Sequence, residues 1–126
     1  MIKKVTVDGL AKLPAFCHAT IAGDFVYVSG TLGALPNSMD VIKAGIGPET
    51  KQTLENIEVI LKACDVTWAE VVKVNVFIAD MKDFAGMNEA YLEIVEYFYS
   101  DGVVHIFAVC HQYHVKLTQA TSRIHY

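Results

Sequence analysis

The feature that most constrains the fold is a strand pattern held between two amphipathic helix patterns. Residues 49–64 carry apolar side chains at helical spacing, and Pro48 suits the first turn of that helix. Asp80 can cap a second helix that runs to about Phe98 with one apolar face. Between them, Val72, Val74, Val76 and Ile78 alternate with Val71, Lys73, Asn75 and Phe77, which is the period of a strand. This order predicts a sheet with both helices on one face.

Shorter patterns complete that sheet. Strands are expected over 2–7, 16–22, 25–29, 103–111 and 115–125, with Gly23-Asp24 as a hairpin turn. Residues 67–70 fit a capping box that makes one helical turn. Residues 30–47 form the longest irregular stretch, and such loops often carry function. The prediction is an α+β fold of one domain, residues 1–126.

Composition adds an expectation about assembly. Of the 126 residues, 53% are hydrophobic and 19% are charged. A small soluble monomer carries roughly 25–35% charged residues on its surface. The two helices cover only one sheet face, and the chain is too short to cover the other. We therefore expect other subunits to do so.

Charge and cysteine content exclude several classes of protein. The net charge is −4, and Arg123 is the only arginine, so no basic patch for nucleic acid is present. The sequence has no apolar run long enough to span a membrane and no secretory signal pattern. Three widely spaced cysteines argue against a disulfide framework and for a reducing compartment, and we expect all three to be buried thiols. A cytoplasmic protein that needs no cofactor is predicted.

Five segments carry a resemblance to a known family. They are AGDFVYVSG (22–30), TKQTLENI (50–57), VVKVNVF (71–77), DMKDF (80–84) and MNEAY (87–91). Over about residues 14–99 the chain resembles the Rid family (YjgF-type, reactive intermediate deaminases), with the segments in the family's order and spacing. The resemblance implies a fold similar to that of chorismate mutase and a homotrimer with a central β-barrel. Three ligand pockets then lie between subunits.

The resemblance also implies an activity. Active members hydrolyse enamines and imines, which amino-acid dehydratases release, to 2-oxo acids and ammonia. An arginine grips the substrate carboxylate through a two-donor fork, and a glutamate on the last strand orients a water. A tyrosine and a serine before the first hairpin, and the backbone after the Ser-Gly pair, complete that pocket.

This sequence departs from the family pattern at those positions. The arginine position falls on His105, and the two acidic positions fall on Ala120 and Ser122. The tyrosine–serine pair corresponds to Phe16-Cys17, whereas Gly30 is retained. A neutral imidazole offers one donor, so carboxylate binding should weaken. From about Val103 onward the chain has either diverged to another chemistry or changed reading frame.

The resemblance assigns candidate site residues. His105 shares a strand face with Phe107 and would act as acid or base, and the alternative is a packed or surface imidazole. Asn88 would bond either backbone or ligand. The aromatic candidates fit core positions equally well. The predicted substrate-binding residues are Phe16, Cys17, Gly30, Thr31, Phe84, Asn88, Tyr91 and Phe107.

Two other chemistries are less favoured. Cys110, His111 and His114 suggest a metal site, but alternation places Cys110 and His111 on opposite faces of a strand and no second cluster supplies further ligands. We therefore expect no metal. Cys17 would serve as a nucleophile only beside a base that lowers its pKa, and a small buried residue is the alternative.

Two functions remain open. The first is a Rid-type enzyme that acts on an enamine, an imine or a related unsaturated small intermediate, with His105 as the acid/base. The second is a non-catalytic ligand-binding or chaperone-like trimer that has lost deaminase activity. Both predict a small-molecule ligand and self-association, without nucleic acid or membrane partners. The family has also been called ribonucleases, but the charge balance gives no support to that activity.

Overall fold

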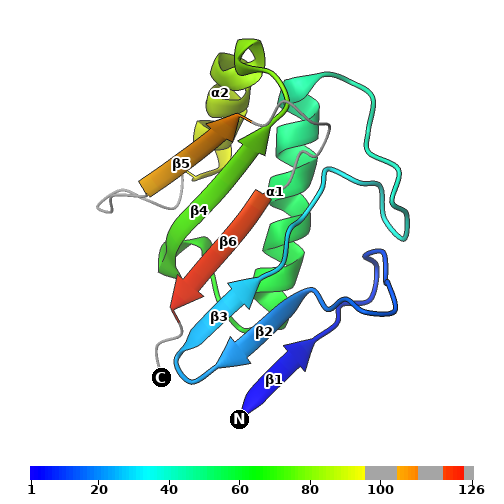
Figure 1. Cartoon of the computed structure of the whole chain (residues 1–126), viewed down its shortest axis with the longest axis vertical. Helices are drawn as coiled ribbons and strands as arrows, with labels where there is room; N and C mark the ends of the chain where they lie inside the picture. Colours follow the sequence, from blue (N-terminus) through cyan, green and yellow to red (C-terminus); the bar gives the residue numbers. More distant parts are fainter. Residues whose placement is uncertain (96–104, 111–117, 124–126) are drawn as a thin grey trace.

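The computed structural model describes the backbone of residues 1–95, 105–110 and 118–123, and the side chains of residues 1–94. Strands and helices follow the order predicted from the sequence (Figure 1). The strands are β1 (Ile2–Val5), β2 (Ala19–Ala22), β3 (Phe25–Val28), β4 (Val71–Ile78), β5 (His105–Cys110) and β6 (Thr118–Arg123). The helices are α1 (Ile46–Ala63), α2 (Phe84–Val95) and the short 3-10 turns η1 (Trp68–Glu70) and η2 (Met81–Asp83).

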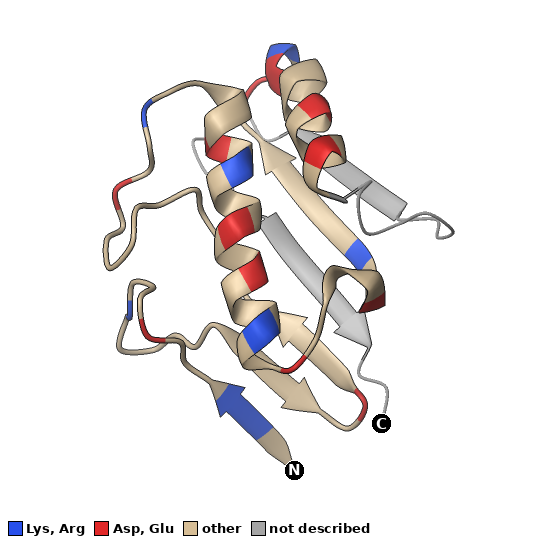
Figure 2. Ribbon diagram, turned by 180° about the vertical axis from the view of Figure 1, so that it is seen from behind, with Lys and Arg blue, Asp and Glu red and all other residues tan. Residues whose placement is uncertain are grey.

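All six described strands form one sheet in the order β1-β2-β3-β6-β4-β5. Neighbouring strands are antiparallel except β4 and β5, which run parallel because α2 connects them. Both helices lie on the same side of this sheet (Figure 1, and from behind in Figure 2). The predicted α+β class, with two helices on one sheet face, is confirmed.

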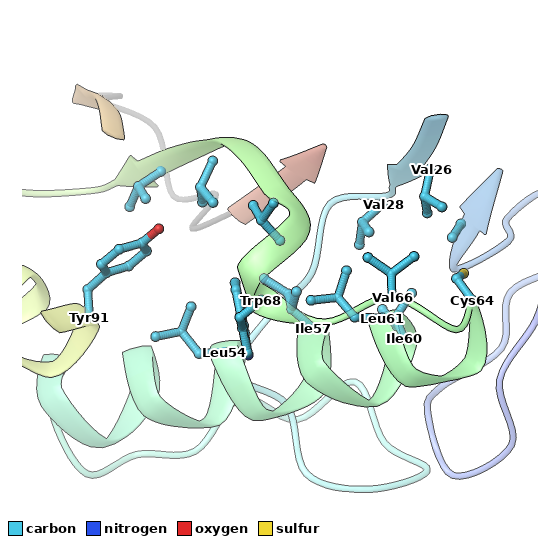
Figure 3. Close-up of a cluster of buried hydrophobic side chains, with 14 of the residues drawn as sticks. Val26, Val28, Leu54, Ile57, Ile60, Leu61, Cys64, Val66, Trp68 and Tyr91 are labelled. Carbon is cyan, nitrogen blue, oxygen red and sulfur yellow. The ribbon is translucent and has the colours of Figure 1, made fainter. Parts of the chain in front are cut away.

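The core fills the space between that sheet face and the two helices (Figure 3). Val26 and Val28 face it from β3, and Val74 and Val76 face it from β4. The helix α1 buries one stripe, Leu54, Ile57, Ile60 and Leu61, at the spacing that the sequence predicts. Acidic and basic residues occupy positions on the outward face of α1 (Figure 2).

Strand β4 departs from the alternation expected from its sequence. Regular alternation predicts Val72 on the face of Val74, but Val71 is buried and Val72 is 48% exposed. The pairing of β4 with β6 shifts register between Val71 and Lys73, so a β-bulge changes the phase of the strand there. As a result, Val72 and Lys73 are both exposed, and alternation resumes at Val74.

The described residues leave the sheet face away from the helices uncovered. Its described positions include the large side chains of Phe25, Tyr27 and Val72, all of them exposed. Tyr27 and Val72 are each 48% exposed. An apolar sheet face of this kind is typical of a surface that another chain covers.

The helix cap that the sequence predicts at Asp80 is confirmed, whereas the capping box predicted at Thr67 is wrong. The Asp80 carboxylate accepts a hydrogen bond from the backbone N–H of Lys82 at 2.9 Å, as a cap should, although the first turn is the 3-10 turn η2. Thr67 precedes the 3-10 turn η1 but makes no side-chain capping bond, so the capping box predicted there is wrong. In the described part of the chain no helix is both long and apolar enough to cross a membrane.

Candidate functional site

A pocket among the described residues lies against α1, between two loop segments. Residues 10–18 form one side, and residues 30–39 form the other. Its volume is about 230 Å³. Leu10, Leu32, Ala34 and Ile60 form apolar walls, and the partly exposed Leu13, Phe16, Leu35 and Met39 form the rim. The site is therefore a largely apolar pocket with an apolar mouth.

His18 holds the first of these segments in place. Its Nδ1 accepts a hydrogen bond from the backbone N–H of Val7 at 2.8 Å, and its Nε2 lies 2.9 Å from the carbonyl oxygen of Ala11. Because Nδ1 accepts, the proton is assigned to Nε2, which donates to Ala11. The His18 ring also packs edge-on against the ring of Phe16, with centroids 5.7 Å apart. The buried histidine thus fixes the loop that carries the pocket rim.

Asn56 on α1 holds the second segment. Its Nδ2 donates to the carbonyl oxygens of Leu32 at 2.9 Å and Ala34 at 3.0 Å. Its Oδ1 accepts from Nε2 of Gln52 at 3.0 Å. The TLENI part of the family resemblance contains this asparagine, but nothing in the sequence indicated that it fastens a loop 22 or more residues away.

Gly33 allows the same loop to approach α1 closely. A Cβ atom there would lie 2.5 Å from the carbonyl oxygen of Glu49. That oxygen belongs to the backbone, so moving it aside would cost free energy. We expect Gly33→Ala to lower the free energy of unfolding by about 1–3 kcal/mol through overpacking. Urea denaturation measures this change.

Gly47→Ala is the matched control, because a Cβ at Gly47 meets nothing within 4 Å and the residue lies inside α1. That variant should be neutral or more stable by up to about 1 kcal/mol. Equal losses in the two variants would contradict the close approach of residues 33 and 49.

Three of the predicted substrate-binding residues meet at this pocket. Phe16, Gly30 and Thr31 all line it, although they come from two separate segments. Cys17 is half-buried beside them, and its carbonyl oxygen accepts a hydrogen bond from the Ser29 hydroxyl at 2.6 Å. The structure thus brings Phe16, Gly30 and Thr31 together at one pocket of a single chain, and their role in substrate binding stays a prediction.

Three others lie elsewhere, on α2. Phe84 is exposed and Asn88 is half-buried. Tyr91 is 1% exposed and belongs to the core cluster (Figure 3). It borders a cavity of about 30 Å³, which has room for about one water molecule. Within one chain, therefore, no α2 residue with a described side chain joins Phe16, Gly30 and Thr31 at the larger pocket.

The remaining two predicted residues lie on β5, whose backbone is described and whose side chains are not. His105 pairs with Lys73 of β4, and Phe107 pairs with Asn75. Lys73 also pairs with Thr121, which pairs with Tyr27. These positions form one row across the sheet, so His105 lies about 14 Å from Tyr27, or three strand spacings of about 4.8 Å.

This row includes a cation that sequence analysis did not single out. Lys73 is exposed on the open face at the register position next to His105. Regular alternation alone gives no reason to select it. Its place beside His105 depends on the parallel pairing of β4 with β5.

The structure describes the side chains of two of the three cysteines and of none of the clustered histidines. Cys17 and Cys64 are free thiols, and burial raises the pKa of the Cys64 thiol despite the opposing charge of Lys3. The predicted burial holds for Cys64, whereas Cys17 is half-buried. The side chains of Cys110, His111 and His114 lie outside what the structure describes. In the described residues no three His, Cys, Asp or Glu side chains gather as metal ligands do.

Comparison with known proteins identifies the family. Residues 7–108 match the family described as endoribonuclease L-PSP, to which the YjgF and Rid proteins belong. The chain belongs to the Rid family. A 2-iminobutanoate/2-iminopropanoate deaminase of Rattus norvegicus is 38% identical over 93 residues, which are 72% of this chain and 68% of that protein. A RutC family protein of Pyrococcus horikoshii is 40% identical over 78 residues, or 62% of each chain.

Solved structures of Rid proteins share the fold over nearly the whole length. Yeast Mmf1 superposes with a TM-score of 0.83 at 26% identity, covering 99% of this chain and 100% of that one. RidA from the Antarctic bacterium Psychrobacter gives a TM-score of 0.82 at 26% identity, covering 97% and 99%. The similarity in structure therefore extends further along the chain than the similarity in sequence to the curated relatives.

Proposed function

We propose that this Rid protein hydrolyses an enamine, an imine or a related unsaturated small intermediate. The observation that carries the proposal is its 38% identity to a relative named as an imine deaminase, over 72% of the chain. In the reaction, water adds to the C=N carbon, the C–N bond breaks, and the nitrogen leaves as ammonia. The products are the oxo compound and ammonia, without any change in oxidation state.

We propose that the working form is a homotrimer with its pockets between subunits. The open sheet face supports this, because Phe25, Tyr27 and Val72 present large apolar side chains that the single chain does not cover. A further reason is the separation of the candidate residues. In one chain Phe16, Gly30 and Thr31 lie apart from α2, and an interface between chains would bring residues of different subunits together.

His105 is the proposed acid/base. It stands at the position of the family's arginine, and imidazole exchanges protons near neutral pH. Lys73 lies at the adjacent register position and is exposed, so its ammonium offers a charge partner for a substrate carboxylate. A single ammonium is a point charge and not a fork, so we expect looser recognition of carboxylates than an arginine gives.

The test is turnover of freshly generated imines. 2-Iminobutanoate, formed in the assay from threonine by a dehydratase, is converted to 2-oxo acid and ammonia, and the rate of ammonia release is measured. His105→Ala should lower kcat/KM by about 100-fold or more, the usual contribution of a general acid–base group. Lys73→Gln should raise KM more than it lowers kcat, because it removes a positive charge from the proposed binding site.

His125→Ala is the control for loss of an imidazole elsewhere, and light scattering checks that every variant keeps the assembly of the unmodified protein. Unchanged turnover in His105→Ala would remove His105 from the mechanism. Absence of ammonia release by the unmodified protein, at any practical concentration, would instead favour the non-catalytic ligand-binding or chaperone-like trimer. The missing family arginine and acid are the observations that favour this second function.

A further inference from the structure

The pocket beside α1 is large enough for one substituted aromatic ring. Its volume is about 230 Å³. An apolar protein cavity of about 150 Å³ is enough to bind benzene. Phe16 and Met39 at the rim offer a ring and a thioether, both of which make favourable contacts with an aromatic ligand.

The described side chains that line the pocket offer no counter-charge to a charged ligand. None of its lining residues is an Asp, Glu, Lys or Arg. The nearby Asp8 and Lys12 are exposed and pair with each other, and that pairing lowers the pKa of the Asp8 carboxyl. A carboxylate that entered the pocket would lose its hydration without gaining a counter-charge, which is strongly unfavourable.

The polar groups of the pocket are mostly committed to the protein. Both nitrogens of His18 and the side-chain amide of Asn56 already bond other residues. The Thr31 hydroxyl donates to the carbonyl oxygen of Ser29 at 2.9 Å. The Ser38 hydroxyl oxygen accepts from the backbone N–H of Asp40 at 2.9 Å, which leaves its own proton available to a ligand. The pocket thus suits a ligand with at most one or two weakly polar groups.

We propose that this pocket binds a small uncharged aromatic molecule, with a polarity between that of toluene and that of a phenol. The inference goes beyond deamination, since it requires neither ammonia release nor His105. It shares with the proposed function only the lining residues Phe16, Gly30 and Thr31. The two proposals differ in the polar groups that the ligand would meet, which are His105 and Lys73 for a carboxylate substrate and the Ser38 hydroxyl for a neutral aromatic ligand.

The test is titration of the full chain with toluene, phenol and benzoate. Binding is measured by calorimetry and by NMR shifts of methyl groups. Toluene and phenol should bind with sub-millimolar Kd, and benzoate should bind at least about tenfold more weakly, a difference that calorimetry resolves readily. Ser38→Ala should weaken binding of phenol several-fold and leave that of toluene unchanged. Ala11→Phe should fill the pocket and weaken binding of toluene at least about tenfold.

Ala15→Phe is the matched control, because Ala15 is exposed in the same segment and does not line the pocket. Benzoate binding as tightly as toluene, or toluene binding that Ala11→Phe leaves unchanged, would overturn the proposal. The comparison of the three ligands on the unmodified protein decides the matter even if Ala11→Phe does not fold. Toluene binding retained in His105→Ala, whatever its turnover, separates this proposal from the deaminase proposal.

Discussion

Leu61→Ala should lower the free energy of unfolding by about 2–5 kcal/mol, the range for truncating a fully buried leucine. Leu61 is 0% exposed at the C-terminal end of the α1 stripe that packs on the sheet (Figure 3). The variant loses the transfer free energy of the removed methyl groups and leaves a cavity that close packing cannot fill. Because small domains have only about 5–15 kcal/mol of net stability, this is a large fraction of the total.

Urea denaturation followed by fluorescence of Trp68 measures this loss. All variants are compared at one protein concentration, since association contributes to stability. Val59→Ala is the control on the same helix, because Val59 is 42% exposed. We expect it to change stability by less than about 1 kcal/mol. A loss in Leu61→Ala no greater than in Val59→Ala would mean that this face of α1 is not packed as described.

Asn56→Leu should both destabilise the chain and release the loop between β3 and α1, residues 29–45. The change keeps the size of the side chain but removes the two hydrogen bonds that Nδ2 donates to the carbonyl oxygens of Leu32 and Ala34. A buried polar group left without a partner costs about 1–3 kcal/mol, so the two together predict a loss of roughly 2–5 kcal/mol. Urea denaturation measures the stability, and hydrogen exchange measures the loop.

The exchange readout is specific to the loop. The backbone N–H groups of Leu35 and Ile42 bond the carbonyl oxygens of Asp40 and Gly33, each at 3.0 Å, and both should exchange faster in Asn56→Leu. Gln52→Leu makes the same chemical change one turn earlier on α1 and removes only the bond to Asn56. It should cost less than about 1 kcal/mol. Unaltered protection of Leu35 and Ile42 in Asn56→Leu would show that Asn56 does not fasten the loop.

Much of the fold is predictable because its signals are local. Apolar spacing in α1 identifies Leu54, Ile57, Ile60 and Leu61 as the buried stripe, since residues three and four apart share a helix face. Gly23 takes a positive φ of 58° in the predicted hairpin between β2 and β3. The order of strands and helices then leaves few ways to bury both helix stripes on one sheet.

The exposure and role of single residues were less predictable, and Val72 illustrates one reason. Its exposure follows from a bulge, and the bulge is visible only in the pairing of β4 with β6. Tyr91 illustrates another, because a residue on the apolar face of a helix can line a pocket or fill the core. The structure buries Tyr91 beside a cavity of about 30 Å³.

By itself, the sequence determined the α+β class, the one-sided helices and the family, because these depend on periodicity and on motifs of neighbouring residues. Only the tertiary structure decided that Phe16, Gly30 and Thr31 share an uncharged pocket and that Lys73 lies beside His105. Those relations depend on hydrogen bonds between distant residues, such as Val7 with His18 and Ala34 with Asn56, and on strand register. The local spacing of residues does not predict such pairings, because each pairing forms only when residues distant in the sequence come together in the folded chain.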